Sequence, residues 1–237
     1  NHVLATVGQV ASSIVHDFKN ALFVVRGHAE MLKEGTADEA VVERAVKILE
    51  AVDRLSQLSA DVLDYAKVRE PNREEVDLAA FIPTTVEPHR VRAQEAGVQI
   101  LCEGAALGIS LDRHRFARVL ENLLANALDA LNPVAVQGGE GLVAIRWAPV
   151  AEGARITIED NGTGIPSRIL RRIFEPFYSH GKALGTGLGM ATVKKIMEEH
   201  GGRVSVESEE GRGTTVTLTL PDVSGNARKL ITTARFG

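Results

Sequence analysis

The chain has 237 residues, of which 44% are hydrophobic and 24% are charged, and its formal net charge is −4, so its composition is that of an ordinary globular protein with one large or two modest domains. The small negative charge and the lack of a lysine or arginine cluster argue against nucleic acid as the main partner. A single cysteine, Cys102, excludes an intrachain disulfide and a zinc site built from thiolates alone.

Two long helices are predicted at the start of the chain, because apolar or small residues recur there at alternating steps of three and four, as in a coiled-coil seam. In the first helix, over 2–35, the seam consists of Leu4, Val7, Ala11, Ile14, Phe18, Ala21, Val25 and Leu32. After a break at 35–38 it continues through Ala45, Ile48, Val52, Leu55, Ser59, Val62 and Ala66. Pro71 ends the second helix, and the two helices predict an antiparallel hairpin with arms of roughly 50 Å.

Further apolar residues widen the apolar face of this hairpin beyond one seam. They are Val10, Val15, Leu22, Leu49, Leu58 and Leu63. Two copies would therefore close into a dimeric four-helix bundle, which makes the protein a predicted homodimer. The alternative is a monomeric hairpin that packs on the rest of the chain.

From Val76 onward the pattern changes to short strands and helices, after a linker at 71–75. Strands are predicted at 98–104, 142–150, 154–162, 202–209 and 213–221, and helices at 79–96, 112–131 and 187–200. The middle pair of strands forms a hairpin around 151–153. The fold class is α+β, with a mixed sheet covered by helices on one face. We therefore predict a dimerisation domain over 1–70, a second domain over 71–222 and a tail over 223–237.

Two glycine motifs carry the strongest functional signal. DNGTGIP (160–166) places an aspartate before a Gly-x-Gly turn, and GTGLGMATVKKIMEEHGG (185–202) opens a helix with Gly-x-Gly-x-Gly. Glycine accepts positive φ without steric cost and lets backbone amides approach an anion, and a helix N-terminus favours phosphate. Either motif alone is weak evidence; together, with Phe174 and Phe177 between them, they predict an ATP site.

The segment ENLLANALDAL (121–131) places Asn122 and Asn126 four residues apart on one side of a helix. The opposite side is apolar, with Leu120, Leu123, Leu124, Leu128 and Leu131. Amide oxygens suit Mg²⁺, which prefers hard oxygen ligands and bridges phosphates. The sequence thus predicts ATP together with Mg²⁺.

These motifs, preceded by VHDFKN (15–20), stand in the order found in bacterial sensor histidine kinases, and the chain resembles that family from about residue 2 to Pro221. The resemblance implies a protein-histidine kinase of the two-component systems. It also implies an α/β sandwich ATP-binding domain of the GHKL (Bergerat) type after the helical hairpin. The implied reaction is ATP-dependent autophosphorylation of His16, followed by phosphotransfer to an aspartate in the receiver domain of a response regulator.

In this family the histidine is the nucleophile, and the resemblance assigns that role to His16. Asp17 would hydrogen-bond one imidazole nitrogen and hold the other as an acceptor. Asn20, one turn beyond His16, would orient water for dephosphorylation of the regulator, or else is a polar residue on a solvated face. Heptad counting independently places His16 opposite the seam, where a nucleotide domain can reach it.

The resemblance also assigns the nucleotide contacts. Asp160 would accept the adenine amino group, with Gly162 and Gly164 forming the turn, while Asn126 would bind the metal and Asn122 contact phosphate. Residues 167–184 would form a lid. The remaining nucleotide-binding residues are Lys182, Gly185, Thr186, Gly187, Leu188 and Gly189.

Related hydrolytic ATPases carry a water-activating glutamate at the position of Asn122, whereas here the carboxylate is shifted to Glu121, and one residue turns a helical side chain by about 100°. The motif also lacks a lysine-tyrosine pair common in the family, so Lys182, Arg171 or Arg172 must replace a contact. Two alternatives stay open: a hydrolytic ATPase of the same superfamily, and a non-catalytic scaffold that binds nucleotide only to change shape.

No apolar run approaches the length of about 20 residues that is needed to span a bilayer. The residues that follow Asn1 do not show the charged and then apolar pattern of a signal peptide. A cytoplasmic location is expected, with membrane contact only through segments upstream of Asn1, if any.

Overall fold

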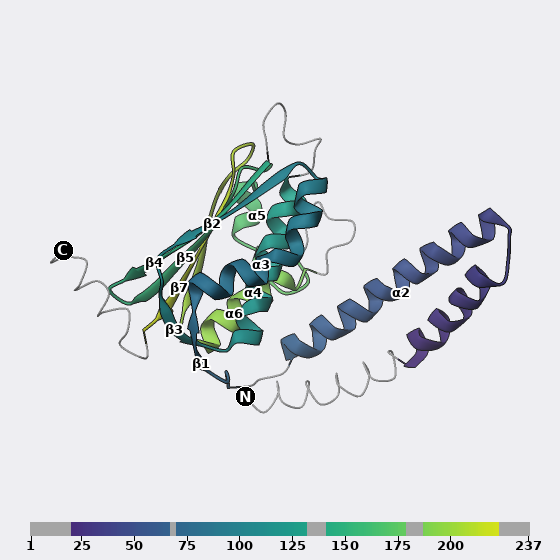
Figure 1. Cartoon of the computed structure of the whole chain (residues 1–237), viewed down its shortest axis with the longest axis horizontal. Helices are drawn as coiled ribbons and strands as arrows, with labels where there is room; N and C mark the ends of the chain where they lie inside the picture. The colour runs from purple at the N-terminus through teal and green to yellow at the C-terminus, as the bar shows by residue number, and fades with distance from the viewer. Residues whose placement is uncertain (1–19, 67–69, 132–140, 179–186, 223–237) are drawn as a thin grey trace. The chain divides into compact units, whose positions relative to one another are not determined.

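The computed structural model describes residues 20–66, 70–131, 141–178 and 187–222. The chain divides into two compact units, residues 1–69 and 70–237. Residues 20–34 are helical, and the other helices are α2 (Glu39–Ala66), α3 (Leu78–Glu95), α4 (Arg113–Ala130), α5 (Ser167–Leu170) and α6 (Gly189–Glu199) (Figure 1). The strands are β1 (Glu74–Asp77), β2 (Val98–Gly104), β3 (Gly108–Leu111), β4 (Gly141–Val150), β5 (Gly153–Asp160), β6 (Arg203–Glu209) and β7 (Gly213–Pro221).

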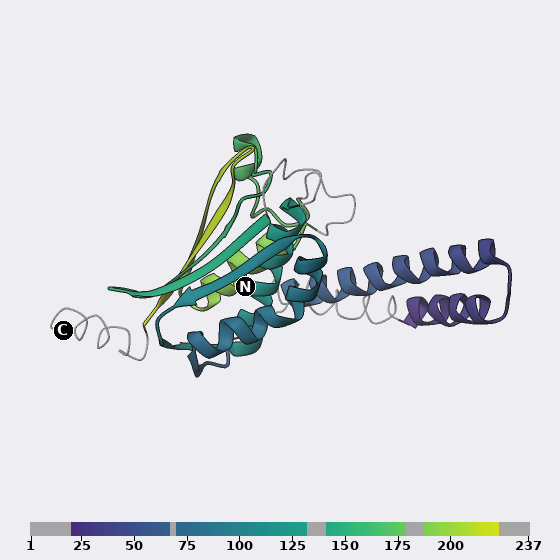
Figure 2. The ribbon, with the colours of Figure 1, turned by 45° about the horizontal axis from the view of Figure 1, so that its top comes forward.

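The first unit is the predicted helical hairpin. The helix over 20–34 runs antiparallel to α2 in both views (Figures 1 and 2). Asp38 caps α2, because its carboxylate accepts a hydrogen bond of 2.9 Å from the amide of Ala40. Arg26 and Asp53 form an ion pair that joins the two helices. No helix in the described ranges is long and apolar enough to cross a membrane.

The stripe that the two helices bury is not the whole predicted seam. The hairpin buries Leu22, Ala29, Ala45, Val52 and Ser59. By contrast, the predicted seam residues Val25 and Leu32 are 44% and 51% exposed. A helix with two neighbouring apolar stripes buries only one of them against a single partner helix, so the heptad pattern does not decide which stripe that will be.

The second unit is a five-stranded sheet covered by helices on one face. The strand order is β2-β4-β5-β7-β6, with β2 parallel to β4 and the other neighbours antiparallel. Helices α3, α4 and α6 cover one face, as Figure 2 shows. The core between the layers includes Phe81, Phe116, Leu124, Trp147 and Ile156. The predicted α+β class with helices on one face is therefore confirmed.

In the second unit, the predicted long elements agree with the structure to within two residues. In the first unit, α2 is described only to Ala66, whereas the helix was predicted to continue to Pro71. The segment expected at 79–96 is α3, and that expected at 187–200 is α6. The predicted hairpin around 151–153 is also confirmed, because Val150 pairs with Gly153 in the antiparallel register of β4 and β5.

Three short elements were missed. Strand β1 lies partly in the predicted linker and pairs with β3, with Val76 opposite Ile109. Helix α5 occupies the first residues of the predicted lid, for which no helix was predicted. Strands of four residues carry almost no periodicity, and their pairing comes from a segment some 30 residues away in the chain.

A buried histidine joins α4 and α6, the two helices of the second unit that carry predicted site residues. His200 is fully buried; its Nε2 accepts a hydrogen bond of 3.0 Å from the amide of Asp112, and its Nδ1 lies 2.7 Å from the carbonyl of Ile196. These contacts require the neutral Nδ1–H tautomer, and burial lowers the pKa of His200 accordingly. Asp112 in turn caps α4 by accepting from the amide of Arg115 at 3.1 Å.

Candidate nucleotide-binding site

Asp160 ends β5 with its side chain on the helix-covered face, where it is only 9% exposed. Its carboxylate accepts a hydrogen bond of 2.9 Å from the amide of Gly162 and another from the amide of Thr214. Burial raises the pKa of Asp160 from 3.8 to about 6, although these two amides oppose the change. The result is a largely dry carboxylate that is mostly ionised at pH 7 and suited to accept a hydrogen bond from a ligand.

The turn after Asp160 needs glycine at two positions. A Cβ on Gly162 would lie 2.6 Å from the carbonyl oxygen of Ala130, at the end of α4. Gly164 has φ +65°, and a Cβ there would overlap the carbonyl oxygen of Glu209. The turn is thus pressed between α4 and the β6–β7 hairpin, which fixes its backbone amides next to Asp160.

Helix α4 presents the asparagine pair as the sequence predicted. Its apolar side is buried: Leu120, Leu123, Leu124, Leu128 and, just beyond the helix, Leu131. Asn122 and Asn126 are half-buried on the other side, whereas Glu121 is exposed. The side-chain amide of Asn122 donates to the carbonyl of Arg118 at 2.8 Å. The carboxylate of Glu121 therefore lies on a different side of α4 from Asn122 and Asn126 and is not placed to activate water there.

The start of α6 approaches α4 closely at Asn122. A Cβ on Gly189 would lie 3.0 Å from Asn122 Oδ1. Gly187 has φ +67°, and a Cβ there would lie 2.5 Å from the carbonyl carbon of Phe177, which itself has φ 63°. Among the described residues, no side chain caps the start of α6. The backbone amides at the start of α6 suit phosphate oxygens, and the oxygen of Asn122 beside them suits a cation bound with the phosphate.

Several predicted site residues lie outside the described residues. They are His16, Asp17, Lys182, Gly185 and Thr186. Asn20 lies at the start of the described part of the first helix and is exposed. Of the candidate replacement contacts, Arg172 is engaged elsewhere: it lies 2.8 Å from the carboxylate of Glu175 and stacks on the ring of Tyr178 at 4.2 Å.

Thr214, which lies beside Asp160 on the neighbouring strand, was not predicted as a site residue. Thr214 is the register partner of Asp160 in the β5–β7 ladder. The available signal was Gly213, directly before it, which has φ +114° and whose Cβ would overlap the carbonyl oxygen of Asp160. A glycine there allows β7 to approach Asp160 closely.

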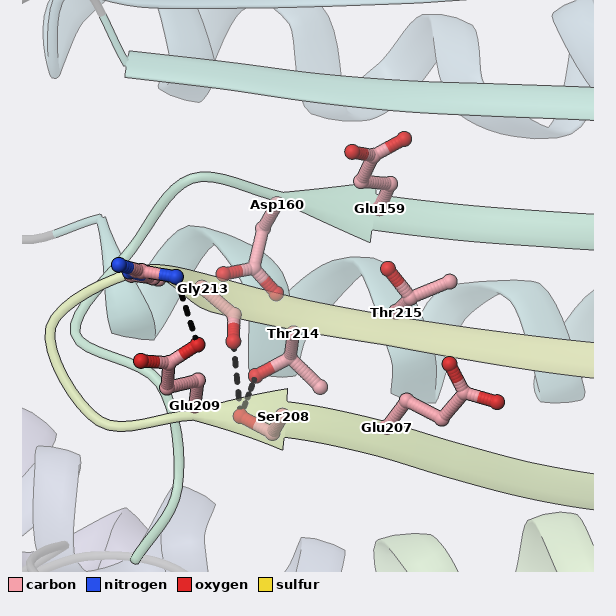
Figure 3. Close-up of a pocket in the computed structure, with 9 residues that line it drawn as sticks. Glu159, Asp160, Glu207, Ser208, Glu209, Gly213, Thr214 and Thr215 are labelled. Carbon is pink, nitrogen blue, oxygen red and sulfur yellow. Dashed lines mark hydrogen bonds and ion pairs between the residues drawn. The ribbon is translucent and has the colours of Figure 1, made fainter.

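A shallow pocket of about 340 Å³ lies beside this region at the β6–β7 hairpin (Figure 3). Its lining includes Asp160 but also Glu159, Glu207 and Glu209, and it includes neither asparagine of α4 nor any residue of α6. A surface with this many carboxylates would repel a triphosphate. This pocket is therefore a poorer candidate for the phosphate site than the start of α6 beside Asn122.

Two family models match the chain. The model described as "Histidine kinase-, DNA gyrase B-, and HSP90-like ATPase" matches residues 111–224, and "His Kinase A (phospho-acceptor) domain" matches residues 6–71. Among curated proteins, the signal transduction histidine-protein kinase AtoS of Escherichia coli (strain K12) is 31% identical over 92% of this chain and 35% of its own length. The chain thus spans about a third of that relative.

Solved structures of histidine kinases share the fold. Full-length ShkA in complex with AMPPNP matches with a TM-score of 0.76 and 26% identity, over 90% of this chain and 45% of ShkA. The histidine kinase ThkA, in complex with the response regulator protein TrrA, matches with a TM-score of 0.66 and 23% identity, over 94% of this chain and 64% of ThkA. The second likeness concerns the fold alone.

Proposed function

We propose that this chain, which belongs to the histidine kinase family, binds ATP with Mg²⁺ in its second unit and transfers the γ-phosphoryl group to His16. The observation that carries the proposal is a convergence on one side of the unit. Asp160 with its glycine turn, the asparagines of α4 and the glycine-rich start of α6 together match what adenine and a triphosphate require.

Asp160 would select adenine, because its ionised carboxylate accepts a hydrogen bond from an exocyclic amino group. The same position faces a carbonyl oxygen in guanine, and two acceptors facing each other are disfavoured. The phosphates would lie toward Gly187 and Gly189 at the start of α6. Lys182, Gly185 and Thr186 remain predicted phosphate contacts.

The residues present suit Mg²⁺ bound together with the nucleotide. The described residues hold no group of three His, Cys, Asp or Glu side chains that could bind a metal by themselves. Amide oxygens such as those of Asn126 and Asn122 instead suit an ion that keeps waters and phosphate oxygens as its other ligands. Asn126 would be the direct ligand and Asn122 the phosphate-side contact, and the ion would offset charge on the phosphate oxygens.

Phosphotransfer would then proceed on the first unit. An imidazole nitrogen of His16 attacks the γ-phosphorus in line, a nitrogen–phosphorus bond forms, and the bond to the β–γ bridging oxygen breaks to release ADP. Asp17 would hold the other ring nitrogen as an N–H donor. The phosphoryl group would next pass to a carboxylate oxygen of an aspartate in a response regulator. In a separate phosphatase reaction, Asn20 would orient a water molecule that hydrolyses the phosphorylated aspartate and releases inorganic phosphate.

The hairpin supports a homodimer with a four-helix bundle. Large apolar side chains are exposed along it: Phe23, Val24, Val25, Met31, Leu32, Ile48 and Leu55. Exposed apolar side chains in this number on one helical hairpin are unfavourable in water unless a partner covers them. Because Val25 and Leu32 belong to the predicted seam but not to the stripe that α2 covers, a second copy of the hairpin is the partner we propose.

The reaction class can be tested with γ-labelled ATP and the whole chain. We expect Mg²⁺-dependent label on the protein that is lost in acid and survives alkali, as phosphohistidine does. Steady release of inorganic phosphate with no labelled protein would instead indicate the hydrolytic ATPase. Nucleotide binding without label or hydrolysis would indicate the scaffold.

A further inference from the structure

Ser208 lies one strand beyond the residues assigned to the nucleotide site, yet it contacts both segments that surround Asp160. It belongs to β6, is half-buried on the helix-covered face, and lies 2.8 Å from the amide nitrogen of Ile165, at the end of the glycine turn. The same hydroxyl lies 2.8 Å from the carbonyl of Gly213 and 2.9 Å from the hydroxyl of Thr214 (Figure 3).

These three contacts use the full hydrogen-bonding capacity of the Ser208 hydroxyl, which has one hydrogen and two lone pairs. The carbonyl of Gly213 can only accept, so it takes the hydrogen of Ser208. The amide of Ile165 can only donate, so it occupies one lone pair. The Thr214 hydroxyl must then donate to the other lone pair, which commits its only hydrogen to Ser208.

The orientation of the Thr214 hydroxyl affects the hydrogen bonds that Asp160 can accept. Thr214 is the register partner of Asp160, and Figure 3 shows the two side chains on neighbouring strands at the same end of the sheet. With its hydrogen committed to Ser208, the Thr214 hydroxyl can only accept further hydrogen bonds. It therefore does not donate to the Asp160 carboxylate, which keeps acceptor capacity for a ligand.

We propose that Ser208 is a positioning residue of the nucleotide site, which fixes the end of the glycine turn through Ile165 and turns the Thr214 hydroxyl away from donating to Asp160. The inference rests on the proposed function, in which Asp160 accepts the amino group of adenine. In this proposal Ser208 acts through Ile165 and Thr214.

The test is calorimetric titration of the whole chain with ADP between pH 5 and 8. Ser208→Ala removes the three hydrogen bonds of this hydroxyl, so we expect affinity at pH 7.5 to fall about fivefold to twentyfold. The matched control is Ser205→Ala on the same strand, whose side chain lies on the open face, and which we expect to bind within about twofold of the unchanged chain. Ser208→Thr keeps the hydroxyl and should restore most of the affinity.

A second readout separates positioning from loss of structure. In Ser208→Ala the Thr214 hydroxyl is free to donate to the ionised Asp160, which stabilises the charged carboxylate. The pH at which ADP affinity is half lost should therefore move down by about half a unit or more. Adding Thr214→Val to Ser208→Ala should remove that displacement. If Ser208→Ala does not fold, Ser208→Cys has a similar volume and much weaker hydrogen bonding, and the same expectations apply.

The outcomes distinguish this inference from the proposed function. If Asp160→Asn binds ADP as tightly as the unchanged chain, the proposed role of Asp160 is wrong. If Asp160→Asn weakens binding while Ser208→Ala matches Ser205→Ala at every pH, the inference on Ser208 is overturned. Weaker binding by Ser208→Ala with an unmoved pH midpoint would overturn the claim that Ser208 orients the Thr214 hydroxyl.

Discussion

Replacing Asp160 with asparagine should stabilise the second unit while it weakens nucleotide binding. The carboxylate is buried, and burial raises its pKa from 3.8 to about 6. The folded state thus holds this proton more tightly than the unfolded state, so the stabilisation from proton binding is complete below about pH 4 and is lost as the pH rises through about 6. Asparagine carries no charge at any pH and avoids that loss.

The structure sets the size of the effect. Each pH unit between 3.8 and about 6 is worth about 1.4 kcal/mol, so at pH 7.5 the ionised carboxylate lowers the free energy of unfolding by about 3 kcal/mol relative to a neutral group. Asparagine has one acceptor oxygen for the amides of Gly162 and Thr214, and losing one of these bonds costs about 1 kcal/mol. We therefore expect Asp160→Asn to gain about 2 kcal/mol at pH 7.5 and to be slightly less stable than the unchanged chain at pH 4, where the lost hydrogen bond still costs about 1 kcal/mol and most of the charge effect is absent.

Trp147 makes the measurement specific to this unit, because it is the only tryptophan of the chain and lies buried in β4. Urea unfolding followed by its fluorescence should give the gain at pH 7.5 for Asp160→Asn. Glu207→Gln, an exposed change on β6, should give no change at either pH. A less stable Asp160→Asn protein at pH 7.5, or a difference that does not depend on pH, would refute the reasoning.

The same buried carboxylate predicts that ADP affinity of the unchanged chain falls about tenfold from pH 7 to pH 5, as measured by calorimetry, because only about a tenth of Asp160 is ionised at pH 5. Gly187→Ala should weaken ADP binding at least tenfold, since the residue has φ +67° and a Cβ would meet the backbone of Phe177; unchanged affinity would remove this glycine from the site. Asn126→Ala should lose Mg²⁺-dependent labelling more completely than Asn122→Ala, and identical Mg²⁺ titrations of the two variants would contradict the division of roles. Leu32→Glu should convert the homodimer to monomer in sedimentation experiments, whereas a stable dimer would mean that its 51% exposed side chain lies outside the interface.

The sequence predicted the parts of the fold that depend on local periodicity. Helix α4 combines a row of leucines with two asparagines on the opposite side, and both its helical state and its buried face were predicted correctly. Strands β5 and β7 alternate apolar and polar residues over eight or nine positions, which is enough to identify them. Strands β1 and β3 have four residues each, and their pairing depends on the rest of the fold.

The candidate site likewise contains residues that the sequence identified and residues that it could not identify. Glycines with positive φ, such as Gly164 and Gly187, mark the turns because few other residues fit there. Ser208 and Thr214 could not be identified from the sequence, because each is an ordinary strand residue. The role proposed for Ser208 depends on a hydrogen bond from the amide of Ile165, 43 positions earlier in the chain. The stripe buried in the hairpin was not predictable from one chain's heptads, since Leu22 and Val25 are equally apolar and only packing decides between them.

The central claim is that His16 receives phosphate from ATP bound in the other unit. The most direct measurement incubates the chain and its His16→Ala variant with γ-labelled ATP and Mg²⁺, and also titrates both with ADP. We predict that His16→Ala loses more than nine tenths of the acid-labile label while its ADP affinity stays within about twofold, because the nucleophile contributes nothing to the nucleotide site. Undiminished acid-labile label on His16→Ala would contradict the account, since another residue would then be the acceptor.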